Sequence, residues 1–461
     1  MTLSSRMSRF ELRVAFLLAG IFSTRMLGLF MILPVFALYA QNIEGYSPLL
    51  VGLALGIYGL TQAFLQIPLG RLSDRIGRKP VILGGLVVFA IGSVVAAMAD
   101  SMWGIILGRA LQGAGAIASA VMALAADLTR EEHRVKVMAL IGISIGISFA
   151  LALIIGPLLH SWAGLSGIFW ITALLAVSGI LLVLTKVPSP AVSRFRRDTE
   201  VELDWIGEAL RHPQLLRLDL SIFILHFILM ASFVVVPLML HEQITSGVGS
   251  HWQVYLPVLL LAMLAVSPFI FMAEKKHKIK QVFTTAIFII MLSQLALSQW
   301  GNSFAGLVFL LWLFFTAFNL LEAMLPSLVS KMAPAAHKGT AMGAYSTAQF
   351  LGVFLGGLMG GWSVGQWGNE SVFVLNGILA FGWLMLVWRM PQPQYHSSYM
   401  LNVGMMDDNQ GAELADQLSE IVGVEEALVV AREGVAYLKV DMKVLDIDKL
   451  NSYSVSAIDE P

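Results

Sequence analysis

The sequence contains no cysteine among its 461 residues, and it has few charged residues of either sign. The absence of cysteine excludes disulfide bonds, thiolate metal sites and cysteine nucleophiles. Asp, Glu, Lys and Arg make up 13% of the chain, whereas about a quarter of a soluble domain is charged. Charges this sparse cannot cover a water-facing surface. The net charge of −1 also gives no basic field that would attract nucleic acid.

Long apolar runs are abundant instead, because 57% of the residues are hydrophobic. Runs of about twenty residues are long enough to cross a bilayer core of about 30 Å as helices. Transmembrane strands would alternate polar and apolar residues, and these runs do not. The sequence therefore predicts an all-α membrane protein with twelve spans, near 14–40, 49–70, 80–99, 102–127, 135–160, 163–186, 217–241, 252–273, 281–299, 303–330, 339–366 and 370–389.

The distribution of Lys and Arg predicts how these spans are oriented. Basic residues stay on the cytoplasmic side of a membrane. With twelve spans, nearly all of the 29 Lys and Arg fall in the loops and tails of one side, and the loops of the other side have none. Only Arg25 and Arg109 lie within spans. We therefore expect a multi-pass membrane protein with both termini in the cytoplasm.

The spans divide into two sets of six, which predicts two bundles at 1–187 and 217–391. The segment 188–216 between them is expected to form a cytoplasmic linker. Leu203, Ile206, Leu210 and Leu215 recur near helical spacing in it, as in an amphipathic helix on the membrane surface or a solvated linker helix. Two sets of six helices are typical of transporters with a central site between two bundles.

The residues after 398 have the composition of a soluble domain. Leu414, Leu418, Ile421 and Val422 share one face of a predicted helix, and the segments around it alternate like strands. The expected order is β-α-β-β-α, and a short final strand could follow it. We therefore predict a small cytoplasmic ferredoxin-like α+β domain over 398–461. It is acidic, with thirteen acids against four bases from Met400 onward.

The sequence "GRLSDRIGRK" follows the second span and carries the most specific pattern in the chain. Its residues at Gly70, Asp74, Arg75, Gly77 and the pair Arg78-Lys79 resemble the signature loop of the major facilitator superfamily. The resemblance covers about residues 10–390. Together with the C-terminal domain, the chain looks like the bacterial YajR-type transporters, whose extra module is called the YAM domain. This resemblance implies that the membrane is a bacterial inner membrane.

This resemblance implies a conformational switch at the signature loop. Asp74 would face the N-terminus of the eleventh helix, near Gly339 and Thr340, where a carboxylate gains about 0.3–2 kcal/mol from the helix dipole. That contact would join the two bundles only while the cytoplasmic side is closed. Asp127 and Arg134 would complete a charge relay with Arg78.

Two further patterns resemble the family in the fourth and fifth helices. Arg109, Gln112 and Gly113 match its Arg-x-x-Gln-Gly pattern, which implies proton coupling; the alternative is a structural anchor on backbone carbonyls. Gly156 and Pro157 match its antiporter motif and predict a hinge. Ala152 and His160-Ser161 depart from that motif, which weakens the inference of antiport over symport.

Other polar residues inside spans are candidates for proton coupling or the substrate cavity. Glu322 is the only acid well inside a span of the second half, and burial would favour its protonated form. Asn319, one turn earlier, could share its hydrogen bonds, and His226 could titrate. Arg25 is expected to contact an anion, Glu322 or backbone carbonyls. Each of these side chains could equally be structural.

The predicted function is a proton-coupled secondary transporter that exports a small amphipathic or drug-like compound by alternating access. The alternatives are a facilitator or symporter, or a membrane ligand sensor with a regulatory cytoplasmic domain. No Walker loop and no hydrolase constellation is present, so neither an ATP-driven pump nor an enzyme is expected. The expected partners are lipid, substrate and protons, with no cofactor, metal or nucleic acid. The C-terminal domain is expected to dock on the basic loops or bind a small ligand.

Overall fold

The computed structural model describes residues 7–188, 207, 211–244, 247–275, 278–334, 337–391, 397–431, 434–440 and 444–454. The chain forms two compact units. The first contains Met1–Phe195, Arg217–Leu325 and Gly343–Met390, and the second contains Arg196–Leu216, Pro326–Met342 and Pro391–Pro461. Most of the predicted linker at 188–216, including Leu203, Ile206 and Leu210, lies outside the described residues.

The first span is shorter than predicted. Helix α1 covers Arg9–Phe30 and begins with a capping box between Ser8 and Glu11. The expected continuation to residue 40 is wrong, because the chain turns before α2 (Phe36–Tyr39) and the 3-10 helix η1 (Ala40–Asn42). Pro34 lies in this turn, and proline has no N–H for a helical hydrogen bond. The interruption is therefore encoded in the sequence.

The second span is longer than predicted, and this changes the signature segment. Helix α3 covers Pro48–Ile76 and α4 covers Arg78–Ala97, so Gly77 alone separates them. Its φ of 97° and ψ of 153° favour glycine. The expected loop is therefore two helix ends joined at one glycine, with Asp74 in the last turn of α3 and Arg78 at the start of α4.

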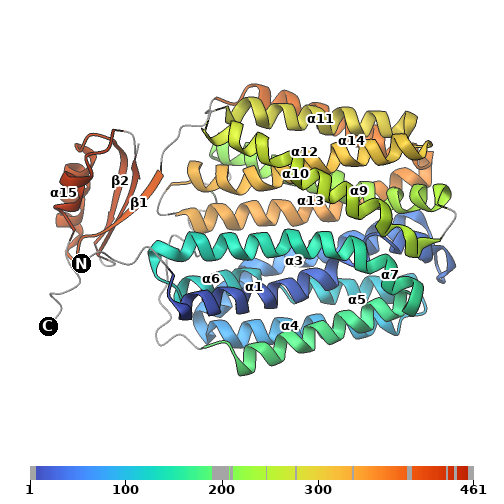
Figure 1. Cartoon of the computed structure of the whole chain (residues 1–461). Coiled ribbons are helices and arrows are strands. Elements are labelled where there is room, and N and C mark those ends of the chain that lie inside the picture. The colour runs from blue at the N-terminus through green and yellow to red at the C-terminus, as the bar shows by residue number, and fades with distance from the viewer. Residues whose placement is uncertain are drawn as a thin grey trace. The chain divides into compact units, whose positions relative to one another are not determined.

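Helices α5 (Met102–Ala114) and α6 (Ala118–Asp127) together form the fourth crossing. Helix α7 (Glu131–Thr185) contains the fifth and sixth crossings, divided at Gly164, whose φ is 67°. The second half follows with α9 (Pro213–Gln243), the 3-10 helix η2 (Val248–Ser250), α10 (Trp252–Lys275), α11 (Ile279–Trp300), α12 (Phe304–Met332), α13 (Lys338–Trp367) and α14 (Glu370–Trp388). The helices of each half lie together (Figure 1).

Twelve crossings are present in the part of the chain that the structure describes. Ten helical segments are long and apolar enough to cross a membrane. One of these is α7, which folds back on itself at Gly164, and α13 adds a crossing that is rich in glycine and polar residues. Large apolar side chains such as Phe64, Trp162 and Leu264 are exposed on the helices, as expected for surfaces that face lipid. The predicted all-α membrane fold is confirmed.

Helices α3 and α13 bring the two halves into close contact. A Cβ atom at Gly56 would lie 2.6 Å from the Phe354 carbonyl oxygen, and one at Gly59 would lie 2.5 Å from the Phe350 carbonyl oxygen. A Cβ atom at Gly52 would likewise contact the Gly357 carbonyl oxygen. Small residues allow helix backbones to approach this closely inside a membrane. Below, the end of the bundle that contains Gly77 is called the motif end.

The C-terminal module has the predicted element order, β-α-β-β-α. Its elements are β1 (Ser397–Asn402), α15 (Asp408–Ser419), β2 (Val424–Val430), β3 (Val435–Val440) and α16 (Ile447–Asn451). The antiparallel sheet has the order β1-β3-β2. Leu418, Leu438 and Leu450 are fully buried between sheet and helices. The optional last strand would fall after residue 454, outside the described residues.

Candidate functional site

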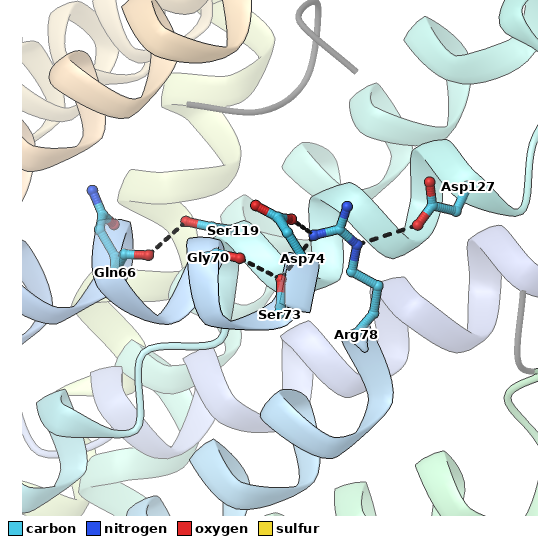
Figure 2. A network of polar contacts seen from close by, with 7 residues as sticks. All are labelled: Gln66, Gly70, Ser73, Asp74, Arg78, Ser119 and Asp127. Atoms are coloured by element: carbon cyan, nitrogen blue, oxygen red, sulfur yellow. Dashed lines mark hydrogen bonds and ion pairs between the residues drawn. The ribbon is translucent and has the colours of Figure 1, made fainter. Parts of the chain in front are cut away.

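The signature segment folds into a compact polar network at the motif end. Arg78 is 2% exposed. Its Nη1 donates to Ser73 Oγ at 2.9 Å and contacts the Asp74 carboxylate, and its Nε donates to Asp127 Oδ2 at 3.2 Å (Figure 2). Ser73 Oγ in turn donates to the Gly70 carbonyl oxygen at 2.6 Å. One guanidinium therefore bridges the ends of α3 and α6.

Close packing of α3 against α6 positions the residues of this network. A Cβ atom at Gly70 would lie 3.0 Å from the Ser119 Cβ, so glycine lets α3 approach α6. Ser119 Oγ also donates to the Gln66 carbonyl oxygen at 3.2 Å (Figure 2). Lys79 Nζ donates to the Val187 carbonyl oxygen at 2.8 Å and so ties the start of α4 to the end of α7. The basic residues of the motif therefore have structural contacts as well as a topological role.

Other predicted members of the switch lie around this network. Arg75 is exposed on the last turn of α3, and Arg134 is buried near the start of α7. A quarter of the Asp74 side-chain surface is exposed, so its carboxylate is accessible beyond the contact with Arg78. The approach of Asp74 to Gly339 and Thr340 would join the two compact units, and it stays a prediction.

The two halves are also hydrogen-bonded within the first unit, through a residue that the sequence did not single out. Gln66 on α3 donates from Nε2 to Thr347 Oγ1 on α13 at 3.1 Å, and it approaches the Gly343 carbonyl oxygen at 3.5 Å. At the opposite end of the same helices, Gly361 packs on Pro48. The halves therefore touch at both of these positions along α3 and α13.

An ion pair between buried Glu11 and exposed Arg130, which the sequence did not indicate, connects α1 to the turn before α7. The Glu11 carboxylate is 3% exposed and accepts three hydrogen bonds from Arg130, at 3.1 Å from N, 3.0 Å from Nε and 3.1 Å from Nη2. It also accepts one from Ser8 N at 2.8 Å. The capping box was the local signal at Ser8 and Glu11. No pattern indicated the partner 119 residues away.

Arg109 has the geometry of an anchor between helices. It is 1% exposed, and its Nε and Nη2 donate to the carbonyl oxygens of Ala54 and Leu55 on α3 at 3.3 and 3.5 Å. Its Nη1 donates to Gln112 Oε1 at 2.9 Å, and Gln112 Nε2 continues to Ser93 Oγ at 2.8 Å. These are the contacts expected of the structural alternative. A role in proton coupling stays a prediction.

Arg25 does not contact Glu322, so the predicted pairing is wrong. The guanidinium is fully buried, and its Nη2 donates to Gln62 Oε1 at 2.6 Å. It lies over the Tyr58 and Phe89 rings, 5.5 and 5.6 Å from their centroids. The physical reason is that Arg25 points into the first half, whereas Glu322 contacts helices of the second.

Glu322 lies instead in a cluster built by α9, α12 and α13. Its Oε2 is 3.8 Å from His226 Nε2, and its Oε1 is 3.5 Å from Gln349 Nε2. Gln349 Nε2 is also 2.8 Å from His226 Nε2. The side chain of Glu322 is 38% exposed and that of His226 is 10% exposed. The structure thus brings together two residues that the sequence proposed separately, and it adds Gln349.

Asn319 does not share the hydrogen bonds of Glu322 as expected. Its Nδ2 has no hydrogen-bond partner within the described ranges. A second acid, Asp219 in α9, is 5% exposed and was not singled out by the sequence reasoning. Its position just inside the predicted seventh span was the available signal.

Gly156 and Pro157 lie where α7 packs against the interruption of the first span. A Cβ atom at Gly156 would contact the Met31 carbonyl oxygen and would lie 3.1 Å from Pro34 Cγ. Glycine therefore permits the contact, and Pro157 removes one helical hydrogen bond beside it. Whether this point is a hinge stays a prediction. Across the described ranges, no group of three or more His, Asp and Glu side chains is placed to hold a metal ion.

Comparisons with known proteins agree with this architecture. Residues 17–355 and 222–399 match the Major Facilitator Superfamily. The chain is 47% identical over 440 residues to the inner membrane transport protein YajR of Escherichia coli K12, covering 95% of this chain and 96% of that protein. It is 24% identical over 388 residues to the multidrug resistance protein MdtH of Klebsiella pneumoniae, covering 81% of this chain and 93% of that protein. Among solved structures, a bacterial homologue of the human lysosomal transporter Spinster in an inward-facing and occupied conformation is similar, with a TM-score of 0.67 and 13% sequence identity. The similarity covers 83% of this chain and 97% of that chain.

Proposed function

Because this chain belongs to the Major Facilitator Superfamily of membrane transporters, we propose that it is a proton-coupled exporter of a small amphipathic compound. It would work by alternating access in a bacterial inner membrane, with both termini in the cytoplasm. The positions of Lys and Arg support this orientation, and the name of the relative YajR supports this membrane. The relative MdtH, named a multidrug resistance protein, supports export.

The observation that carries the proposal is the cluster of Glu322, His226 and Gln349. Ionisable side chains inside a membrane span are costly and are kept mainly where they serve a function. Part of the Glu322 side chain is exposed while His226 is nearly covered, so Glu322 is the member whose side chain a cavity can reach. Its Oε2 is itself buried and has no hydrogen-bond partner among the described residues. Neutral Glu322 would hold the proton, and ionised Glu322 would accept a hydrogen bond from Gln349. Exchange between these two forms would couple protons to transport when they differ in how readily the two halves change between outward-open and inward-open states.

The network at the motif end would control which side is open. Arg78 holds Asp74 between α3 and α4, so the carboxylate stays fixed at the end of its helix. We propose that Asp74 then accepts from the N-terminus of α13 near Gly339 and Thr340 while the cytoplasmic side is closed. An interaction of about 0.3–2 kcal/mol is weak enough to be reversed in every cycle.

The C-terminal module would dock on the cytoplasmic end of α12. Lys439 Nζ on β3 donates to the Met332 carbonyl oxygen at 3.4 Å, and it also pairs with Glu426 at 3.2 Å. A cation near the last carbonyls of a helix is favourable. The contact supports a regulatory role for the domain, because α12 also carries Glu322. Lys439→Gln is expected to change the transport rate without abolishing transport.

The test is transport by the purified protein in vesicles with an imposed pH gradient. A panel of fluorescent amphipathic dyes serves as substrate, and internal pH is recorded in parallel. Dye movement and proton movement should be linked in the wild type and unlinked in Glu322→Gln, with a similar effect in His226→Gln. Glu370→Gln is the matched control, because Glu370 is an exposed acid at the start of α14.

Three results would overturn the proposal. Dye flux that is the same with and without the gradient would indicate a facilitator. Dye movement in the same direction as proton movement would indicate a symporter. Dye binding without flux would indicate a sensor.

A further inference from the structure

We propose that the buried cluster of Arg25, Tyr58 and Gln62 binds the carboxylate of the transported compound, which makes the substrate an organic anion with an apolar body. This inference rests on the proposed function and specifies its substrate class. The cluster lies in the first half of the chain, on α1 and α3, and is separate from the signature network and from Glu322.

The cluster contains more hydrogen-bond donors than the protein satisfies. Arg25, Tyr58 and Gln62 are each at most 1% exposed. Arg25 Nε, Arg25 Nη1 and Gln62 Nε2 make no well-formed hydrogen bond among the described residues. The Tyr58 hydroxyl interacts with the Arg25 side chain, and its own proton meets no acceptor there. The contact between Arg25 Nη2 and Gln62 Oε1 uses the amide oxygen, so the Gln62 amide nitrogen remains as a donor.

These groups call for a partner that accepts hydrogen bonds and carries negative charge. The guanidinium and the amide nitrogen can only donate, and a hydroxyl can donate as well. An unsatisfied charged group in the membrane interior is costly unless an opposite charge or acceptor is supplied. The planar fork of an arginine matches the two oxygens of a carboxylate. An organic cation would offer neither an acceptor nor the right charge.

The charges around the cluster favour the same class of ligand. Arg109 lies on the same tyrosine, with its guanidinium carbon 5.4 Å from the Tyr58 ring centroid, compared with 5.5 Å for Arg25. Two guanidinium groups therefore share one ring. The hydrogen bonds of Arg25 and Arg109 go to amide or carbonyl oxygens. The local positive charge thus attracts an anion, and the phenyl face of Phe89 offers an apolar wall.

Access to the cluster depends on the movement of the two halves. The Phe350 ring on α13 lies 6.3 Å from the Tyr58 ring in an edge-on arrangement, and its carbonyl oxygen packs against Gly59. Phe350 therefore covers the cluster from the opposite half. Separation of α3 from α13 would remove this cover and expose the donors. A site that is buried when the halves close and open when they part is what a substrate site in alternating access requires.

The experiment measures binding of defined probes to the purified full-length protein by thermal shift, at one pH and without a gradient. The probes are benzoate, benzyl alcohol, benzyltrimethylammonium and chloride. Benzoate has both a negative charge and an aromatic ring, the next two have the ring without a negative charge, and chloride has the negative charge without a ring. Benzoate should stabilise the wild type at concentrations where the other three do not. Arg25→Gln should weaken benzoate binding about tenfold or more, the usual effect of losing a hydrogen bond to a charged group.

A second variant keeps the test decisive if Arg25→Gln does not fold. Gln62→Glu supplies a carboxylate of the protein's own to Arg25, so it should fold and also lose at least about tenfold in benzoate affinity. Glu322→Gln should bind benzoate as the wild type does, which separates a failure of this inference from a failure of proton coupling. Equal stabilisation by chloride, no stabilisation by benzoate, or full benzoate binding in Gln62→Glu would each overturn the proposal.

Discussion

Removal of Arg78 should leave a buried carboxylate without its partner, and the cost can be estimated from the structure. The Asp127 side chain is 2% exposed and accepts from Arg78 Nε at 3.2 Å, whereas the Asp74 side chain is 25% exposed. Breaking a buried pair by deleting one partner costs about 3–5 kcal/mol. We therefore expect Arg78→Gln to lower the free energy of unfolding by about that amount, mostly through Asp127.

The assay is a double-mutant cycle on the purified protein, with unfolding by a denaturing detergent followed by tryptophan fluorescence. Adding Asp127→Asn to Arg78→Gln should restore about 1–3 kcal/mol, because the carboxylate without a partner is then removed. Arg75→Gln is the control, since Arg75 is exposed one turn away and should change stability by no more than about 0.5 kcal/mol. If the two changes at Arg78 and Asp127 simply add, the pair is not coupled and this reasoning fails.

Two further predictions test the packing of the helices. Gly56→Leu should prevent close approach of α3 and α13, because a Cβ atom there would lie 2.6 Å from the Phe354 carbonyl oxygen. Disulfide formation between one cysteine introduced on each of these helices should then fall sharply compared with the same double-cysteine protein without the leucine. Gly84→Leu, with nothing within 4 Å of its Cβ position, should leave this cross-linking unchanged. Glu11→Gln should destabilise the protein by about 1.5–3 kcal/mol, because Arg130 then loses a charged acceptor; an unchanged midpoint of thermal unfolding would contradict this.

Much of the fold follows from the pattern of apolar runs and from single glycines and prolines. The twelve runs predicted the crossings, and the long segment at 188–216 divided them into two sets of six. The errors lie where local rules compete. Helix α1 ends at Phe30, shortly before Pro34, although the sequence stays apolar beyond it. The segment 71–76 is helical, although its charged residues suggested a loop. Hydropathy reports contact with lipid, and helix ends depend on backbone hydrogen bonds.

The local sequence predicted the candidate site only where its residues are near in sequence, and the contact of Arg78 with Asp127, 49 residues away, was expected from the family resemblance alone. Ser73, Asp74 and Arg78 lie within one helix turn and one glycine, so a local motif contains them. The contacts of Arg25 with Gln62 and of His226 with Gln349 join different helices. Nothing in the local sequence states which faces of two helices meet, so these partners required the structure.

The most direct test of alternating access measures the separation of the two halves at the motif end. The chain has no cysteine, so cysteines introduced at the exposed positions Arg71 on α3 and Leu220 on α9 can carry two spin labels without background labelling. The distance distribution is then compared between the labelled protein and the same protein with Asp74→Asn. Loss of about 0.3–2 kcal/mol from the closed state should shift population to the longer distances, by up to about 30-fold. A distribution that is unchanged by Asp74→Asn would contradict the proposal that this carboxylate holds the two halves together.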